Sequence, residues 1–250
     1  GEQVDEIHAA LMRHLVVFFR DQPIDFVAHK RFCSYFGEMH VHVGGDGTAS
    51  SMVEGHPEIR RQHFTADSKR VSGEVWHTDQ SCAPIPPMGS ILHQHIVPPM
   101  GGGDTLFASM YAAHDALPQR LKDRLEGRKG AFTYGGRRKA TALLNAEDRA
   151  WKPVFHPILR VHPETGRKGL YFDPGKILAI EGLQAEESDA LIEELTERMI
   201  QPEGKYRHEW KKGDVVIWDN RCSYHKAAAD YPPEEDRIHW RVSIKEASQP

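Results

Sequence analysis

Two stretches carry most of the information in this sequence: Trp76-His77-Thr78-Asp79 and Trp218-Asp219-Asn220-Arg221-Cys222-Ser223-Tyr224-His225. The first places a histidine and a carboxylate two residues apart, so in an extended strand both side chains point to the same face. The second brings another histidine from the far end of the chain. Two imidazoles and one carboxylate on one side of a metal are the ligand set of non-haem Fe(II) oxygenases. His77, Asp79 and His225 are therefore the candidate metal ligands.

Composition agrees with an enzyme acting on a small molecule. The chain has 250 residues, with 32 basic against 36 acidic side chains. This near-neutral balance predicts no bulk attraction to nucleic acid or to an anionic membrane. No apolar run approaches the roughly 18 residues that a membrane span needs. The three cysteines, Cys33, Cys82 and Cys222, are far apart and odd in number. They indicate a reducing cytoplasm rather than a disulfide framework.

The pattern of apolar residues predicts a mainly β fold with decorating helices. Short apolar stretches bounded by Pro and Gly are expected to be strands, at 15–19, 89–96, 105–108, 154–161, 169–172, 214–218 and 238–245. Helical periodicity is expected at 4–14, from an Asp25 N-cap to a Gly37 stop, at 109–125 and at 186–200. A mobile loop is expected at 128–150, which is rich in Arg, Lys and Gly. A jelly roll fits best, as a single domain over 1–250 with a helical and loop insertion at about 109–150.

Several motifs in a fixed order also match a known family. They are Arg13–Gln22, Phe36–His42, Val75–Asp79, Pro98–Thr105, His162–Gly166, Trp218–His225 and Ala229–Tyr231. The chain resembles the TauD/TfdA (taurine dioxygenase) family of Fe(II)- and 2-oxoglutarate-dependent oxygenases along nearly its whole length. The resemblance implies a double-stranded β-helix (jelly roll, cupin-like), with Fe(II), 2-oxoglutarate and O2 as cofactor and cosubstrates. Because such proteins usually carry a further N-terminal segment, the start at Gly1 is expected to be trimmed.

The resemblance assigns a cationic clamp to the cosubstrate. When 2-oxoglutarate chelates iron, its distal carboxylate points away and needs a desolvated partner, which a planar guanidinium beside a hydroxyl supplies. Arg237 and Thr105 occupy the family's clamp positions. By itself, Arg237 is a surface arginine that follows an acidic run. The spacing from His225 exceeds the family's by one residue, and the run Arg237-Ile238-His239-Trp240-Arg241 favours Arg237 over Arg241 as the clamp.

The resemblance also suggests which residues bind the substrate. His42 and Arg241 stand where the taurine enzyme holds its sulfonate, so a small organic anion is expected; the alternative is a core histidine and a strand-surface charge. Other positions depart from taurine recognition. Gly73 and Gly45 replace larger side chains and are expected to enlarge the pocket, while Lys176 replaces an aromatic residue and adds positive charge. An aryloxyalkanoate, alkyl sulfate or sulfonate-like acid is favoured over taurine.

The implied reaction hydroxylates a C–H bond of that anion and releases succinate and CO2, with cleavage of the product where hydroxylation falls beside a heteroatom. Three alternatives stay open from the residues. A zinc hydrolase uses similar ligands but has no task for a cationic clamp. A non-catalytic protein could bind 2-oxoglutarate on the same fold, and within the family a taurine dioxygenase is possible.

A cytoplasmic homo-oligomer, a dimer or tetramer, is also expected.

Overall fold

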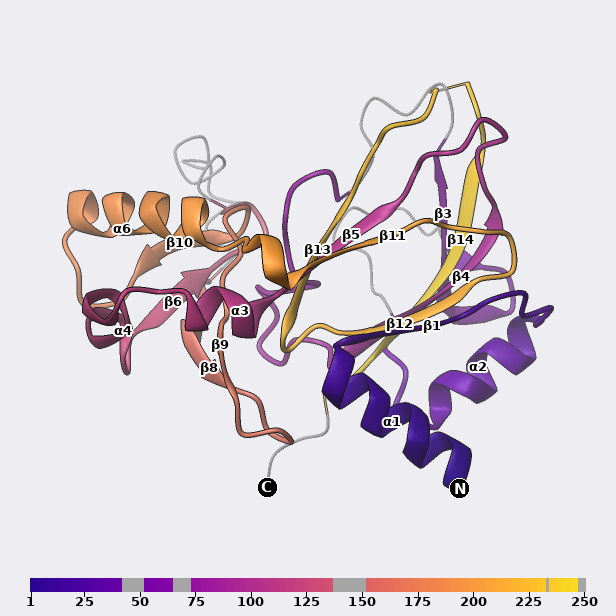
Figure 1. Ribbon diagram of the computed structural model, residues 1–250, viewed down its shortest axis with the longest axis horizontal. Helices are drawn as coiled ribbons and strands as arrows, with labels where there is room; N and C mark the ends of the chain where they lie inside the picture. The colour runs from indigo at the N-terminus through magenta and orange to yellow at the C-terminus, as the bar shows by residue number, and fades with distance from the viewer. Residues whose placement is uncertain (42–51, 65–72, 137–151, 233, 247–250) are drawn as a thin grey trace.

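A six-stranded antiparallel sheet forms the frame of the molecule (Figure 1). The computed structural model describes residues 1–41, 52–64, 73–136, 152–232 and 234–246. In the order in which they lie side by side, the strands are β1 (Val16–Phe19), β12 (Val215–Asp219), β4 (Gly89–Ile96), β14 (Arg237–Ile244), β3 (His56–Phe64) and β2 (Met52–Val53). The last strand of the chain, β14, thus pairs with β4 on one side and β3 on the other.

A second antiparallel sheet packs against the inner face of the first and completes a jelly roll. Its strands are β11 (Lys205–His208), β5 (Thr105–Ser109) and β13 (Ser223–Ala227). Because side chains alternate along a strand, Val216 and Trp218 of β12 face inward and pack with Phe107 of β5. The candidate site lies between these two sheets.

Two N-terminal helices cover the outer face of the large sheet (Figure 1). They are α1 (Glu2–His14) and α2 (Phe26–Ser34). Leu11 and Cys33 from these helices pack on Ile91 of β4 and Ile217 of β12. Both isoleucines lie on the outer face of the large sheet, because side chains alternate along a strand. The Asp25 side chain caps α2 by accepting a hydrogen bond from Ala28 N at 2.7 Å, as the sequence predicts.

A helical lobe with its own apolar cluster lies at the other end of the molecule (Figure 1). It contains α3 (Met110–Asp115), α4 (Gln119–Leu125), α6 (Ala185–Arg198) and the 3-10 helix η3 (Pro202–Gly204), with strands β6 (Lys129–Phe132), β7 (Val154–Pro157), β8 (Leu159–Val161), β9 (Lys168–Leu170) and β10 (Ile177–Ile180). The lobe pairs β10, β6 and β7 in one small sheet and β8 with β9 in another.

Most predicted elements are present, and the differences have local causes. Strand 89–96 is β4 with the same bounds. The single helix expected at 109–125 is two helices, because Pro118 cannot continue a helix that precedes it. The expectation of a loop throughout 128–150 is wrong at its start, where Lys129–Phe132 forms β6; residues 137–151 lie outside the described part.

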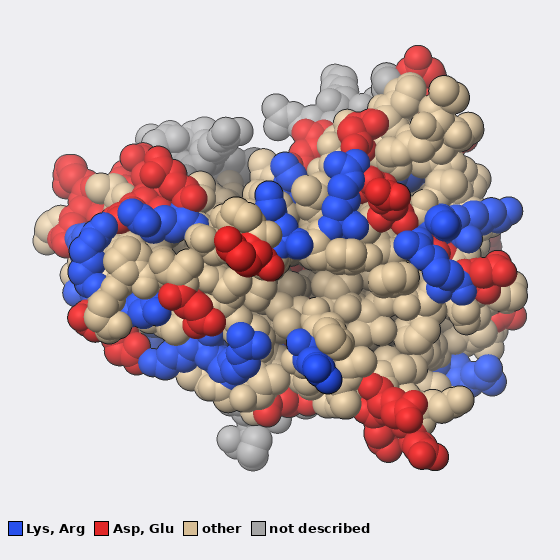
Figure 2. Space-filling model, in the orientation of Figure 1, with Lys and Arg blue, Asp and Glu red and all other residues tan. Residues whose placement is uncertain are grey.

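The surface carries charges of both signs. On the face in Figure 2, Lys and Arg side chains are interspersed with Asp and Glu. Within the described residues, no helix is both long and apolar enough to cross a membrane.

Candidate active site

His77 and His225 meet through an antiparallel bridge between their main chains. His77 N donates a hydrogen bond to His225 O at 3.1 Å, and His225 N donates to His77 O at 2.9 Å. The bridge sets the two imidazole rings side by side, with centroids 4.2 Å apart. His225 lies on β13, which β5 holds in place through the pairing of His225 with Phe107.

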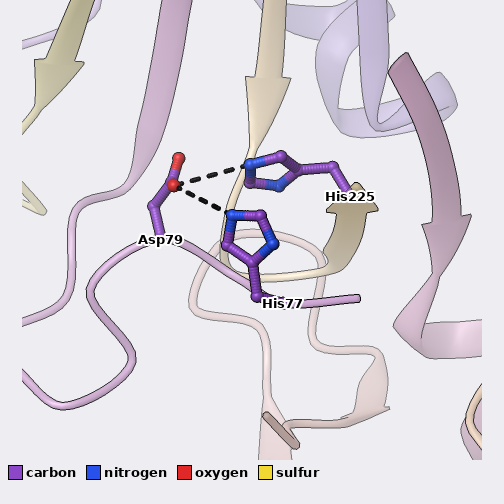
Figure 3. Close-up of side chains that lie close together, drawn as sticks. All are labelled: His77, Asp79 and His225. Atoms are coloured by element: carbon purple, nitrogen blue, oxygen red, sulfur yellow. Dashed lines mark ion pairs between the residues drawn. The ribbon is translucent and has the colours of Figure 1, made fainter. Parts of the chain in front are cut away.

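Asp79 completes the group from a turn rather than from the expected strand. Only His77 is in a bridge, and the chain turns at Asp79, followed by Gln80 with a φ of 49°. The carboxylate nevertheless points at both rings (Figure 3). Asp79 Oδ1 lies 3.8 Å from His77 Nε2 and 3.5 Å from His225 Nε2. The structure therefore brings the three predicted metal ligands together.

The protonation states suit a metal. His77 Nδ1 lies 2.8 Å from Val75 O and donates to it, which leaves Nε2 with a lone pair. Burial and the nearby His225 lower the pKa of His77 to about 4, so the ring is neutral at pH 7. Burial opposes ionisation of Asp79, but Arg241 and then His225 hold its pKa well below its usual range. The group thus offers a neutral His77 nitrogen and an ionised Asp79 carboxylate to a metal.

The spacing of these atoms fits a first-row metal. The three ligand atoms lie within 4.8 Å of one another. An ion about 2.1 Å from each donor, with right angles between the bonds, would separate the donors by about 3 Å. The observed separations of 3.5 and 3.8 Å need only a small contraction.

A second group of possible ligands is already engaged with other partners. His162, Asp219 and Cys222 also cluster. His162 Nδ1 accepts from the backbone, and its Nε2 donates to Asp219 Oδ2 at 3.0 Å. Both carboxylate oxygens of Asp219 accept from Arg221. This cluster is a hydrogen-bonded support of the loop between β12 and β13.

A cavity opens beside the metal centre, between the two sheets. Its volume of about 60 Å³ is several times the roughly 10–15 Å³ that one water needs. The lining residues are Gln62, Gly73, His77, Leu92, Thr105, Trp218, His225, Ala227, Arg237, His239 and Arg241. Two predicted metal ligands, both clamp residues and two predicted substrate residues, Gly73 and Arg241, thus share one cavity.

Gly103 makes room for the side chain of Arg237, and Gly102 makes room for the main chain of Asp230. A Cβ on Gly103 would lie 2.7 Å from Arg237 Cδ and 2.8 Å from its Nε, and a Cβ on Gly102 would lie 2.5 Å from Asp230 O. Both glycines have positive φ, which side chains rarely adopt. Burial lowers the pKa of Arg237 to about 10, so the guanidinium stays charged at neutral pH. A buried cation in a cavity fits a carboxylate ligand.

The predicted substrate residues have different outcomes. Arg241 lines the cavity, and its Nη2 also lies 2.6 Å from Asp79 Oδ2. Gly73 lines the cavity, and a Cβ there would lie 3.1 Å from His77 Cε1. Lys176 is absent from the cavity lining; its amine donates to Tyr134 O at 2.6 Å. His42 and Gly45 lie outside the described residues.

The sequence did not reveal two other polar residues of the cavity, Gln62 and His239. They are paired across β3 and β14, and His239 Nε2 lies 2.6 Å from Gln62 Oε1. Burial and the neighbouring Arg237 and Arg241 hold the pKa of His239 well below its usual range. The spacing held a usable signal, because His239 is two residues from each arginine and shares their face of the strand.

Comparison with known proteins agrees with this geometry. The family model described as "Taurine catabolism dioxygenase TauD, TfdA family" matches residues 1–243. The chain belongs to the TauD/TfdA family. It is an Fe(II)- and 2-oxoglutarate-dependent dioxygenase, and O2 is the second cosubstrate of this family.

Individual TauD/TfdA relatives match most of the chain. The (S)-phenoxypropionate/alpha-ketoglutarate-dioxygenase of Sphingobium herbicidovorans is 31% identical, over 96% of this chain and 85% of the relative. An alkylsulfatase of Acinetobacter baylyi is 32% identical, over 96% of this chain and 76% of the relative. The crystal structure of a taurine dioxygenase from Burkholderia xenovorans superposes with a TM-score of 0.82 at 32% identity, covering 98% of this chain and 82% of that one.

Proposed function

We propose that this enzyme hydroxylates a C–H bond of a small organic anion larger than taurine, such as an aryloxyalkanoate, an alkyl sulfate or a sulfonate. One observation carries the proposal: His77, His225, Thr105, Arg237 and Arg241 line the same cavity. The names of the relatives support the substrate class, since they include a phenoxypropionate dioxygenase and an alkylsulfatase.

In this proposal His77 Nε2, Asp79 Oδ1 and His225 Nε2 hold the iron. The iron, 2-oxoglutarate and O2 supply the oxidising power, and succinate and CO2 are released. Arg237 and Thr105 bind the distal carboxylate of 2-oxoglutarate with a charge-assisted pair and a hydroxyl donor. Both side chains are buried, so water competes little for that carboxylate.

The remaining residues are proposed to position the substrate. Arg241 supplies a cation next to the metal ligands, as a substrate anion requires. His42 is proposed to help from outside the described residues, and Lys176 to add positive charge from beyond the cavity lining. Gly73 leaves space beside His77, because any side chain there would begin 3.1 Å from the imidazole. Hydroxylation beside the ether or ester oxygen of such a substrate gives a product that splits into a carbonyl compound and the released group.

An anaerobic titration tests the reaction class, and a substrate panel tests the substrate. Fe(II) and 2-oxoglutarate together should give a weak visible charge-transfer band. Admission of O2 with aryloxy acids, alkyl sulfates or sulfonates should then release succinate faster than without substrate. Hydrolysis of a panel member without 2-oxoglutarate would instead support a zinc hydrolase. Binding of 2-oxoglutarate without succinate release from any panel member would support a non-catalytic protein.

We also propose a cytoplasmic, single-domain enzyme that forms a homo-oligomer. The three free cysteines support a reducing compartment. Phe18 and Tyr206 stack on each other with partly exposed rings, which supports an apolar contact surface. Sedimentation velocity of the wild type and of Phe18→Ser tests the oligomer, and a monomeric wild type would contradict it.

A further inference from the structure

Asp79 presents its two oxygens to different partners. Oδ1 faces the two imidazoles, as described above. Oδ2 accepts a hydrogen bond from Ser90 Oγ at 2.8 Å and lies 2.6 Å from Arg241 Nη2. A carboxylate oxygen with two such donors is poorly available to a cation, because its lone pairs are already used.

The direction of the Ser90 hydrogen bond is set by a chain of buried groups. The indole nitrogen of Trp218 can only donate, and it donates to Asn220 Oδ1 at 2.9 Å. The amide of Asn220 is thereby oriented, so that its Nδ2 donates to Ser90 Oγ at 3.3 Å. Since Ser90 Oγ accepts this bond, its own hydrogen is directed to Asp79 Oδ2. All four side chains are at most 5% exposed.

This series of hydrogen bonds also connects the segments that carry the proposed metal ligands. Ser90 lies on β4, Trp218 on β12, and Asn220 in the turn that leads to β13 and His225. The main chain of Asn220 accepts from Thr78 Oγ1 at 2.7 Å, between His77 and Asp79. A disturbance at Asn220 therefore reaches the carboxylate without contact to the metal.

We propose that Trp218, Asn220 and Ser90 are positioning residues that, together with Arg241, keep Asp79 Oδ2 occupied and so present Oδ1 alone to the metal. This inference rests on the proposed ligand set. These residues would limit the Asp79 carboxylate to one bond with the metal, so that the remaining positions stay open for cosubstrate and O2. Partners of metal ligands commonly matter 10- to 100-fold for metal affinity or activity.

Anaerobic Co(II) binding, followed by visible absorption without 2-oxoglutarate, tests the proposal independently of turnover. Ser90→Ala should weaken Co(II) binding about 10- to 100-fold and alter the absorption spectrum. Ser188→Ala is the matched control, because Ser188 is an equally buried serine that bonds Ile180 N in the helical lobe. It should bind Co(II) like the wild type. Wild-type affinity and spectrum in Ser90→Ala would overturn the proposal.

A double-mutant cycle tests whether Asn220 acts through Ser90. Asn220→Ala should weaken Co(II) binding in the wild type but cause no further loss in the Ser90→Ala background. An equal loss of Co(II) affinity in both backgrounds would contradict a role of Asn220 through Ser90. If Ser90→Ala does not fold, Trp218→Phe keeps an aromatic ring and removes the indole donor; unchanged Co(II) affinity in that variant would equally contradict it.

Asp79→Ala separates this inference from the proposed function. If wild type and Asp79→Ala bind Co(II) equally, the ligand assignment fails whatever Ser90 does. If Asp79→Ala loses the ion and Ser90→Ala keeps it unchanged, only the positioning role fails.

Discussion

The indole nitrogen of Trp210 donates a hydrogen bond to Thr105 Oγ1 at 3.0 Å. Because Trp210 can only donate, the hydroxyl of Thr105 must accept, and its own hydrogen is left for the cavity. A hydroxyl with a fixed role as donor is suited to a carboxylate ligand. The pair therefore connects a core residue with the proposed cosubstrate clamp.

Trp210→Phe should consequently weaken 2-oxoglutarate binding. Loss of the indole donor lets the Thr105 hydroxyl rotate, which costs about 0.5–1.5 kcal/mol, or roughly 2- to 10-fold in affinity. Anaerobic titration of the Fe(II) protein with 2-oxoglutarate measures this. Co(II) affinity should stay unchanged, and an equal loss of metal binding would indicate general damage to the site instead.

Replacement of any metal ligand should abolish turnover. His77→Ala, Asp79→Ala and His225→Ala each remove one of three donors that face a common point. Substrate-dependent succinate formation and Fe(II) binding should both be lost, with far-UV circular dichroism retained. His162→Gln, in the second cluster, is the control and should still bind Fe(II). Substrate-dependent succinate from any of the three alanine variants would disprove the assignment.

The two cavity arginines should have separable effects. Arg237→Gln leaves the distal carboxylate of 2-oxoglutarate unpaired in a buried site, which should cost about 3–5 kcal/mol, or roughly two to four decades in affinity. Arg241→Gln should mainly raise the substrate KM, measured at saturating iron because Arg241 also pairs with Asp79. Arg207→Gln, which removes the ion pairs of a half-exposed guanidinium with Asp104 and Asp230, is the control. Exchanged phenotypes would show that the clamp is Arg241.

Taurine should be a poor substrate, and position 73 should be one reason. Gly73→Asn places a side chain next to His77 and should lower kcat/KM for bulky acids by at least about 10-fold, since it fills space they need. Gly55→Asn is matched in backbone conformation, with φ of 74° against 87°, but has no atom within 4 Å of its added Cβ. The measurement is kcat/KM for taurine and for an aryloxy acid, in the wild type and in both variants. Efficient use of taurine by the wild type would contradict the interpretation that Gly73 enlarges the pocket. In the same assay, Lys176→Phe tests whether Lys176 contributes to substrate selectivity.

Acid should destabilise the protein through His29. Burial, and then the neighbouring His93, lower the pKa of His29 from 6.5 to about 4. The unfolded chain therefore takes up the proton first, so this stability is complete above pH 6.5 and is lost as the pH falls towards 4. His29 alone should account for about 2 kcal/mol between pH 7.5 and pH 5. Urea unfolding at both pH values measures the loss, and His29→Leu should reduce it by that amount; an unchanged pH dependence would refute the assignment.

The sequence identified the cluster of candidate metal ligands better than the strands around it. The residue types and spacing of His77, Asp79 and His225 mark them as candidate ligands whatever the local structure is. The prediction of the cluster therefore held although Asp79 lies in a turn. Strand β3 escaped prediction because Ile59 is the only fully buried apolar residue among its described side chains, and its other residues are mostly polar. Strand β13 escaped prediction because it has only five residues, and three of them, Tyr224, His225 and Lys226, are titratable.

The partners of the ligands were harder still to predict. Ser90 lies within a strand whose bounds were predicted correctly, yet a lone serine in an apolar strand has no spacing that points to a metal ligand. Its role depends on Asn220 and Asp79, which only the folded sheet brings beside it. The same holds for Gln62, whose pairing with His239 follows from strand register.

The central position of β14 has a consequence for synthesis on the ribosome. Until residues 237–244 emerge, β4 and β3 each lack their shared neighbour, and two strand edges that are buried in the finished sheet remain open. Arg237 and Arg241 arrive on that same strand, so the nascent chain cannot complete the proposed cosubstrate site before the sheet closes. Closure of the sheet and completion of the active site are thus a single late event, and until then two strand edges are exposed to pairing with other chains.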